Sequence, residues 1–206
     1  MASKQEIRSA ETKKNILQAA GRLFSTKGYD AVTMREIAKE AGCSHTTIYI
    51  YFKDKEVLLH QLSMPPLLSL MARMDQLLAT EPYPEAQLKT MSLLMIEFCL
   101  THRNMYSLFF NVKSIRVDHP SPEMELNQLR NNLFSKLRNV IAAYLNNDPL
   151  SERSLMYSRI YFFTLNGIIS TYASSEETVD QLMERLRPTF EHTFEVLLKG
   201  IDALNT

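Results

Sequence analysis

Side chains that can hydrogen-bond to nucleic acid are concentrated in one stretch near the N-terminus, between residues 33 and 55. An imidazole or a threonine hydroxyl can donate or accept a hydrogen bond at the edge of a base pair, and a threonine methyl or a tyrosine ring can cover a thymine methyl group. For each side chain taken singly, a solvated surface position or packing against a neighbouring helix is the alternative. The residues concerned are His45, Thr46, Thr47, Tyr49 and Tyr51.

Two short helices joined by a tight turn are predicted to position these side chains. Thr33 and Glu36 have the spacing of a capping box, which marks the start of the first helix. Gly42 can adopt a positive φ without steric cost and so makes the turn. Ser44 caps the second helix, which is expected to end at residue 51 or 52. The inward side chains of that helix are Ile48 and Phe52.

A longer helix precedes this pair and completes a small three-helix bundle. Apolar residues repeat at steps of three and four from residue 16 to residue 24, and Lys27 followed by Gly28 ends the pattern. The helix is expected to begin near Arg8, after a frayed segment at 1–7. A second short helix that exposes polar and aromatic groups is typical of the helix-turn-helix motif. The N-terminal segment is therefore predicted to bind DNA.

The order and spacing of many positions in residues 8–60 resemble the tetracycline-repressor (TetR) family of transcriptional regulators. So many matched positions are far more specific than a single short motif. Beyond residue 60 the family shares architecture with little shared sequence, so the resemblance assigns no residues there. The positions that carry the resemblance are Ile16, Leu17, Ala19, Ala20, Leu23, Phe24, Gly28, Tyr29, Thr33, Ile37, Ala38, Ala41, Gly42, Ser44, Ile48, Tyr49, Tyr51, Phe52, Lys55 and Leu58.

The resemblance also implies which side chains read the bases. Arg35 matches a base-contacting position and is suited to guanine O6 and N7. A surface ion pair with Glu36 or Glu40 is the alternative for Arg35. The family positions that face base edges in the major groove are occupied by His45, Thr46 and Tyr49.

Contacts to the phosphate backbone form a second implied set. Residues at helix N-termini are suited to phosphate because backbone N–H groups are unpaired there, which applies to Thr33 and Ser44. Lys53 is near enough to assist, and a solvated loop is the alternative for Lys53 and Lys55. The residues that match backbone-contacting positions of the family are Thr47, Tyr51 and Lys55.

The function that the resemblance implies is that of a homodimeric one-component transcriptional regulator. It is expected to be a repressor that binds a pseudo-palindromic double-stranded operator and leaves it when a small-molecule effector binds. Residues 1–53 would form the DNA-binding domain, and residues 54–206 a helical domain for effector binding and dimerisation. A DNA-binding dimer without an effector is the first alternative, and an enzyme that uses a pocket of the helical domain is the second.

Composition agrees with a soluble protein that contacts a polyanion at one end. The 206 residues carry no net charge, but residues 1–60 hold ten basic and seven acidic side chains, a net charge of +3. No apolar run approaches the roughly 18–20 residues that a membrane span requires, and the polar N-terminus does not resemble a secretory signal. Two distant cysteines, Cys43 and Cys99, favour a reducing compartment, so the cytoplasm is the expected location.

The rest of the chain is predicted to be helical, which makes the fold class all-α. A helix from about residue 54 is expected to break at Pro65 and Pro66, with Ser63 capping a new segment, because an internal proline costs about 3 kcal/mol. Further helices are predicted at 88–100, 104–111, 121–145, 152–173 and 178–204, the last with a kink at Pro188. No segment alternates with period two, so no strand is expected.

A pocket for the effector is expected where polar side chains interrupt apolar helices. A packed core with satisfied tyrosines is the alternative. Methionines adapt to irregular ligands but more often fill core gaps, and they include Met64, Met71, Met74, Met91, Met95 and Met105. The polar candidates for the pocket are Glu97, Tyr106, Tyr157, Arg159, Tyr161 and Asn166.

The last two helices carry more apolar surface than one subunit core is expected to absorb, which predicts a four-helix dimer interface. No cofactor, metal site or catalytic group is predicted, because the histidines lie in separate segments and no nucleophile motif is present. Cys99 and His102, three residues apart, are expected to be core and cap residues rather than ligands. The interface candidates are Phe163, Ile168, Phe194, Leu198 and Ile201.

Overall fold

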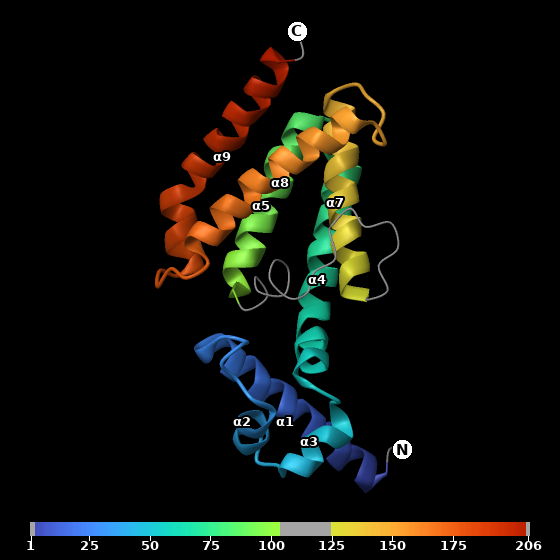
Figure 1. The fold of residues 1–206 in the computed structure, drawn as a ribbon, viewed down its shortest axis with the longest axis vertical. Coiled ribbons are helices and arrows are strands. Elements are labelled where there is room, and N and C mark those ends of the chain that lie inside the picture. Colours follow the sequence, from blue (N-terminus) through green and yellow to red (C-terminus); the bar gives the residue numbers. More distant parts are fainter. Residues whose placement is uncertain (1–2, 104–124, 205–206) are drawn as a thin grey trace. The chain divides into compact units, whose positions relative to one another are not determined.

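The structure is a computed structural model that describes residues 3–103 and 125–204 (Figure 1). These residues form helices joined by turns, and no strand occurs among them, so the predicted all-α class is confirmed. The chain divides into two compact units, Met1–Leu67 and Leu68–Thr206. Unit 1 thus includes residues 54–67, which the sequence pattern placed in the second domain. No described helix is long and apolar enough to cross a membrane.

Unit 1 contains α1 (Lys4–Lys27), α2 (Met34–Glu40), α3 (His45–Tyr51) and the first part of α4 (Lys55–Thr80). Helix α1 begins four residues earlier than predicted, because Ser3 and Glu6 form a capping box that orders the expected frayed end. The predicted three-helix arrangement is present. Its core is formed by Ile16, Ala20, Phe24, Ile37, Ala38, Ile48, Phe52 and Leu58, all buried.

Helix α4 continues through Pro65 and Pro66, which corrects the predicted break. Proline removes a backbone donor, but its fixed φ near −65° still fits a helix. Ser63 does not cap a new segment; its buried hydroxyl donates to the carbonyl oxygen of Leu59 at 2.6 Å within the same helix. Leucines are buried on both sides of the prolines, and their burial offsets the lost hydrogen bonds. They are Leu58, Leu59, Leu67 and Leu70.

Unit 2 contains the rest of α4 with α5 (Pro84–Thr101), α7 (Glu125–Tyr144), α8 (Glu152–Tyr172) and α9 (Val179–Ala203). Helix α5 contacts α7, α8 and α9, so it is the central helix, as its nearly all-round apolar pattern predicts (Figure 1). Helix α9 continues through Pro188. The predicted helix at 104–111 and the predicted cap at residue 121 lie outside the described residues.

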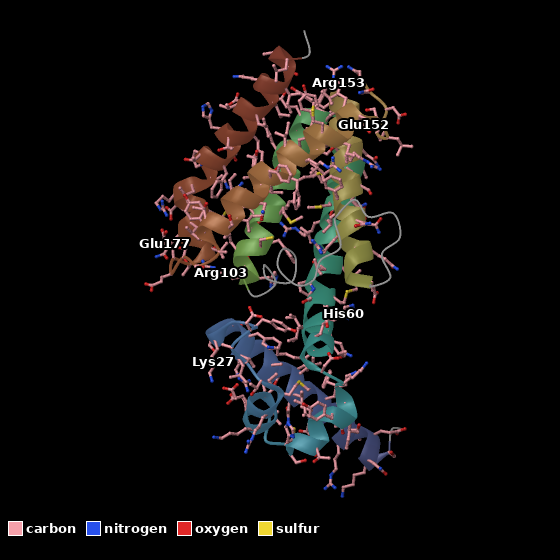
Figure 2. All side chains as sticks on the ribbon, in the orientation of Figure 1. Lys27, His60, Arg103, Glu152, Arg153 and Glu177 are labelled. Atoms are coloured by element: carbon pink, nitrogen blue, oxygen red, sulfur yellow. The ribbon has the colours of Figure 1, made fainter. Side chains whose placement is uncertain are left out.

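Arg103, which follows the C-cap of α5, binds the connection between α8 and α9 (Figure 2). Its guanidinium donates to the carbonyl oxygens of Ser175 and of Glu177, the latter at 2.5 Å. The Glu177 carboxylate in turn pairs with Arg185 of α9 at 2.5 Å. These bonds satisfy two backbone carbonyls in the connection between α8 and α9, and so fix the path of the chain into α9.

Candidate nucleic-acid interface and internal pocket

Helix α2 is fixed at its start by a reciprocal cap. The Thr33 hydroxyl accepts a hydrogen bond from the Glu36 N–H at 3.2 Å, and the Glu36 carboxylate accepts one from the Thr33 N–H at 2.9 Å. The same carboxylate pairs with Lys27 at 2.9 Å. This ammonium and the Thr33 N–H hold the pKa of Glu36 at about 2, below its usual 4.5. The turn that follows uses Gly42 at φ 69°, as the sequence predicts.

Ser44 caps α3 and hydrogen-bonds to Thr47, one of the residues predicted to contact phosphate. Its hydroxyl accepts a hydrogen bond from the Thr47 N–H at 2.9 Å and shares a second one with the Thr47 hydroxyl at 2.7 Å. Thr47 is half-buried, whereas Ser44 is exposed. The two hydroxyls therefore form one polar group at the helix N-terminus, where unpaired N–H groups favour an anion.

Two pairs of residues, each pair one helical turn apart, form the outward face of α3: His45 with Tyr49, and Thr46 with Ile50. Ile48 is fully buried, as predicted, and the exposed positions are His45, Thr46, Tyr49 and Ile50. The rings of His45 and Tyr49 contact each other edge to face, with centroids 5.2 Å apart, so the helix presents them as one unit. Tyr51, expected on this face, is half-buried.

Ile50 is the exposed residue of this face that the sequence pattern missed. An isoleucine in an amphipathic helix is ordinarily assigned to the core, and its neighbour Ile48 fits that assignment. The available signal was helical spacing, because Ile50 lies four residues after Thr46 and so shares its face.

Two basic side chains near α3 are available for contacts with DNA. Arg35 is exposed, and the alternative ion pairs are occupied by other cations, since Glu36 pairs with Lys27 and Glu40 with Arg22. Lys53, in the turn after α3, is also exposed. Their roles in DNA binding stay predictions.

Lys55 lies in a different environment from the solvated loop or open phosphate contact that the sequence suggested. Its ammonium donates to the carbonyl oxygens of Tyr29 and Val32 at 2.7 and 2.9 Å. The same nitrogen lies 4.2 Å from the centroid of the Tyr29 ring. Lys55 therefore links the start of α4 to the connection between α1 and α2, and a phosphate contact by Lys55 stays a prediction.

Unit 2 holds a pocket of about 60 Å³ between α4, α5, α7 and α8. Tyr161 and Ser92 contribute hydroxyls that lie 2.8 Å apart, and both also contact the carbonyl oxygen of Leu88, at 2.9 and 2.8 Å. Arg130 is only 7% exposed, and this burial lowers the pKa of its guanidinium. The apolar lining residues are Met74, Met91, Met95, Leu133, Phe134, Leu137, Phe162 and Leu165.

Of the six predicted pocket residues, Tyr161 lines this pocket. Glu97 instead pairs with Arg73 at 3.6 Å. Tyr157 is buried and Arg159 and Asn166 are half-buried, away from the lining, while Tyr106 lies outside the described residues. The sequence pattern missed Ser92 and Arg130. An arginine in an amphipathic helix is ordinarily assigned to the solvent face, so only packing reveals its burial.

The predicted dimer residues divide into two groups. Phe194, Leu198 and Ile201 are buried within the subunit, which corrects their assignment to a surface between subunits. They face the home core because α9 packs along α5. Ile168 is half-buried, and Phe163 is 65% exposed. The exposed apolar residues of α8 follow helical spacing on one face and are Met156, Ile160 and Phe163.

The remaining candidates for metal or thiol chemistry are structural in the described part of the chain. No group of three His, Cys, Asp or Glu residues there could hold a metal ion. Cys99 is buried, which raises the pKa of its thiol to about 12, and the His102 ring packs on Phe98 with centroids 4.8 Å apart. A thiol with so high a pKa is a poor nucleophile.

Two capped helices joined by a tight turn, the second with an exposed polar face, form a helix-turn-helix motif, the arrangement by which many proteins bind DNA. Residues 16–62 match the bacterial regulatory proteins of the tetR family. This match confirms the resemblance to the TetR family that the spacing of the N-terminal positions predicted.

Individual relatives agree with this assignment. The chain is 28% identical over 188 residues to the uncharacterised HTH-type transcriptional regulator YerO of Bacillus subtilis, covering 85% of this chain and 63% of YerO. It is 42% identical over 62 residues to the HTH-type transcriptional regulator AcrR of Shigella flexneri, covering 30% of this chain and 29% of AcrR. The chain thus spans less than two thirds of either relative.

The fold of the chain is also found among solved structures. The transcriptional regulator FadR of Bacillus subtilis, in complex with stearoyl-CoA, superposes with a TM-score of 0.62 over 91% of this chain and 98% of FadR. Sequence identity in that superposition is 19%, so the likeness concerns the fold.

Proposed function

We propose that this chain is a transcriptional regulator that binds a pseudo-palindromic operator as a homodimer. The observation that carries the proposal is the outward face of α3, where His45, Thr46, Tyr49 and Ile50 are exposed together above a buried Ile48. These side chains can hydrogen-bond to base edges or cover methyl groups, which is the chemistry of major-groove recognition. YerO, AcrR and FadR are all named as transcriptional regulators.

Two copies of α3 are needed for a two-fold operator. Met156, Ile160 and Phe163 form an exposed apolar stripe on α8. Because the stripe is apolar, the same stripe on a second subunit can pack against it, and we propose it as the dimer surface. In a dimer the two α3 helices must lie about 34–36 Å apart, or a multiple of this distance, to enter successive major grooves on one side of the duplex. A role in DNA binding supports the expected cytoplasmic location.

The proposal includes repression that an effector relieves. The effector site is the unit 2 pocket, and the effector class is an apolar molecule with an anionic group placed near Arg130. The stearoyl-CoA bound by FadR combines an acyl chain with an anionic head in the same way. A volume of about 60 Å³ is well below the roughly 300–1,000 Å³ of ligand pockets, so binding requires the pocket to widen. The flexible side chains of Met74, Met91 and Met95 suit such rearrangement.

The lining of the pocket favours binding over catalysis. It includes no histidine, carboxylate or cysteine among the described residues. The hydroxyls of Ser92 and Tyr161 are bonded to each other and to Leu88. A nucleophile next to a base, the arrangement that most hydrolytic mechanisms need, is therefore missing from this lining.

Operator selection tests the proposal directly. Genomic fragments bound by the purified protein are sequenced, and affinity for the recovered duplex and for a random duplex is measured by fluorescence anisotropy across a salt series. We expect a two-fold sequence, tighter binding to it than to random DNA, and a steep fall of affinity with salt as counterions are released. Equal affinity for recovered and random duplexes at moderate salt would refute DNA-sequence recognition by this chain.

The effector class has its own measurement. Dodecanoate and dodecanol share a chain and differ in charge, so they serve as matched probes for Arg130. Dodecanoate should raise the melting temperature of the protein more than dodecanol does, because a ligand of the native state stabilises it. Arg130→Met should abolish that difference. Equal responses to both probes in the unaltered protein would refute an effector whose anionic group lies near Arg130.

A further inference from the structure

Ile50 is a large apolar side chain that the described residues leave mostly exposed. It is 76% exposed, although it lies between Tyr49 and the half-buried Tyr51 on α3. Ser44 caps the helix, and Ile48 and Phe52 anchor it in the core of unit 1, where both are fully buried. A rotation of α3 that buried Ile50 would therefore expose Ile48 and Phe52. The orientation of Ile50 toward the outside is thus imposed by the rest of unit 1.

Ile50 lies on the same face of α3 as the residues proposed to contact base edges. Thr46 precedes it by four residues, which places the two side chains over each other along the helix. Isoleucine has no hydrogen-bonding group and cannot contact a phosphate or a base-edge donor or acceptor favourably. In the major groove the apolar group on a base edge is the C5-methyl of thymine, whereas the minor groove has none.

From this geometry, and resting on the proposed function, we propose that Ile50 contacts a thymine methyl group in each operator half-site and is a specificity-determining residue. The contact removes the apolar surface of both groups from water. Because isoleucine is branched at Cβ, it has one strongly preferred χ1 rotamer in a helix, so little side-chain freedom is lost on binding. Ile50 therefore discriminates thymine from cytosine at one position by apolar contact, in addition to the hydrogen bonds made by its neighbours.

Replacing thymine by deoxyuridine tests this contact, because it deletes the methyl group and keeps the base pair. Each thymine of the selected operator is replaced in turn, symmetrically in both half-sites, and the dissociation constant is measured for the unaltered protein and for Ile50→Ala. At one position the unaltered protein should lose about tenfold in affinity. Ile50→Ala should bind the thymine and deoxyuridine duplexes equally well at that position, while Ile50→Val retains part of the discrimination.

Two controls separate a lost contact from a lost fold or a general effect. Leu150→Ala removes a side chain of equal exposure, 77%, in unit 2, and should leave every dissociation constant unchanged. The melting temperature of Ile50→Ala should match that of the unaltered protein, because the removed atoms are exposed. Random duplex should bind both proteins alike.

The possible contrary results are distinguishable. If Ile50→Ala and the unaltered protein lose the same affinity at every deoxyuridine position, Ile50 contacts no thymine methyl group and the inference is wrong. An equal loss by Ile50→Ala on specific and random duplexes would place Ile50 against the sugar-phosphate backbone and also overturns it. If the unaltered protein does not distinguish operator from random DNA, the proposed function itself fails.

Discussion

The ammonium nitrogen of Lys55 lies 2.7 Å from the carbonyl oxygen of Tyr29 and 4.2 Å from the centroid of the ring of the same residue. A third contact, to the carbonyl oxygen of Val32 at 2.9 Å, completes a clamp across the connection between α1 and α2. These carbonyls belong to a turn without helical hydrogen bonds, so a cation satisfies them. The start of α4 is thereby fixed to the segment that leads into the helix-turn-helix motif.

We expect Lys55→Met to lower the free energy of unfolding by about 1–3 kcal/mol, because hydrogen bonds to a charged donor are lost from half-buried carbonyls. Lys53→Met, at an exposed position two residues earlier, is the matched control and should leave stability unchanged. Urea denaturation followed by circular dichroism measures both. In DNA binding, Lys53→Met should weaken all duplexes alike and flatten the salt slope by about one unit. Similar stabilities for the two variants would argue against a clamp.

The stability that the cap of α2 contributes depends on pH through Glu36. Its pKa is about 2 in the folded protein, chiefly because of the hydrogen bond from Lys27, against 4.5 for an unperturbed glutamate. A lowered folded pKa means that the stabilisation is complete above about pH 4.5 and is lost as the pH falls toward 2. Glu36→Gln keeps a capping side chain without the charge.

The melting temperature of Glu36→Gln should therefore lie below that of the unaltered protein at neutral pH, and the gap should close between pH 4.5 and 2. Lys27→Met removes the other partner of the ion pair and should produce a gap of the same sign at neutral pH. Differential scanning calorimetry in a pH series is the measurement. A gap that persists unchanged at pH 2 would show that the charge of Glu36 does not stabilise α2.

The exposed stripe on α8 predicts where the dimer can be broken. Met156→Glu combined with Phe163→Glu places two charges on an apolar surface, and burial of unpaired charges is strongly unfavourable. The double variant should sediment as a monomer in analytical ultracentrifugation and should bind the operator much more weakly. Tyr83→Glu, at a 71% exposed tyrosine before α5, is the control and should stay dimeric. A dimeric double variant would place the interface elsewhere.

The prolines of α4 allow a test of communication between effector and operator. Because α4 is already continuous, Pro65→Ala with Pro66→Ala should restore two backbone donors and raise the free energy of unfolding by about 3 kcal/mol. If the prolines tune signalling, the effector-induced change in operator affinity should also shift by about 1 kcal/mol or more. Pro188→Ala, inside α9, is the control for stabilisation without altered signalling. A full effector response in the double variant would give the prolines an architectural role only.

The helix-turn-helix motif was predictable from sequence because its determinants are local. Thr33 and Glu36 lie three residues apart, as do Ser44 and Thr47, so caps, turn and inward residues follow from short-range spacing. Apolar periodicity likewise predicted the helices of unit 2, since a buried helix face repeats every three to four residues. The spacing of positions within residues 8–60 then indicated the family, and the family match over residues 16–62 agrees with it.

Only the tertiary structure decided which partner each apolar or charged face meets. Periodicity shows that Phe194 and Leu198 share a face, but the same face could pack on the home core or on a second subunit, and packing against α5 selects the core. Arg130 enters an apolar pocket because α4, α5, α7 and α8 converge around it. Ile50 remains outside because Ile48 and Phe52 already occupy the core of unit 1. These outcomes depend on contacts between residues far apart in the chain, which local spacing does not encode.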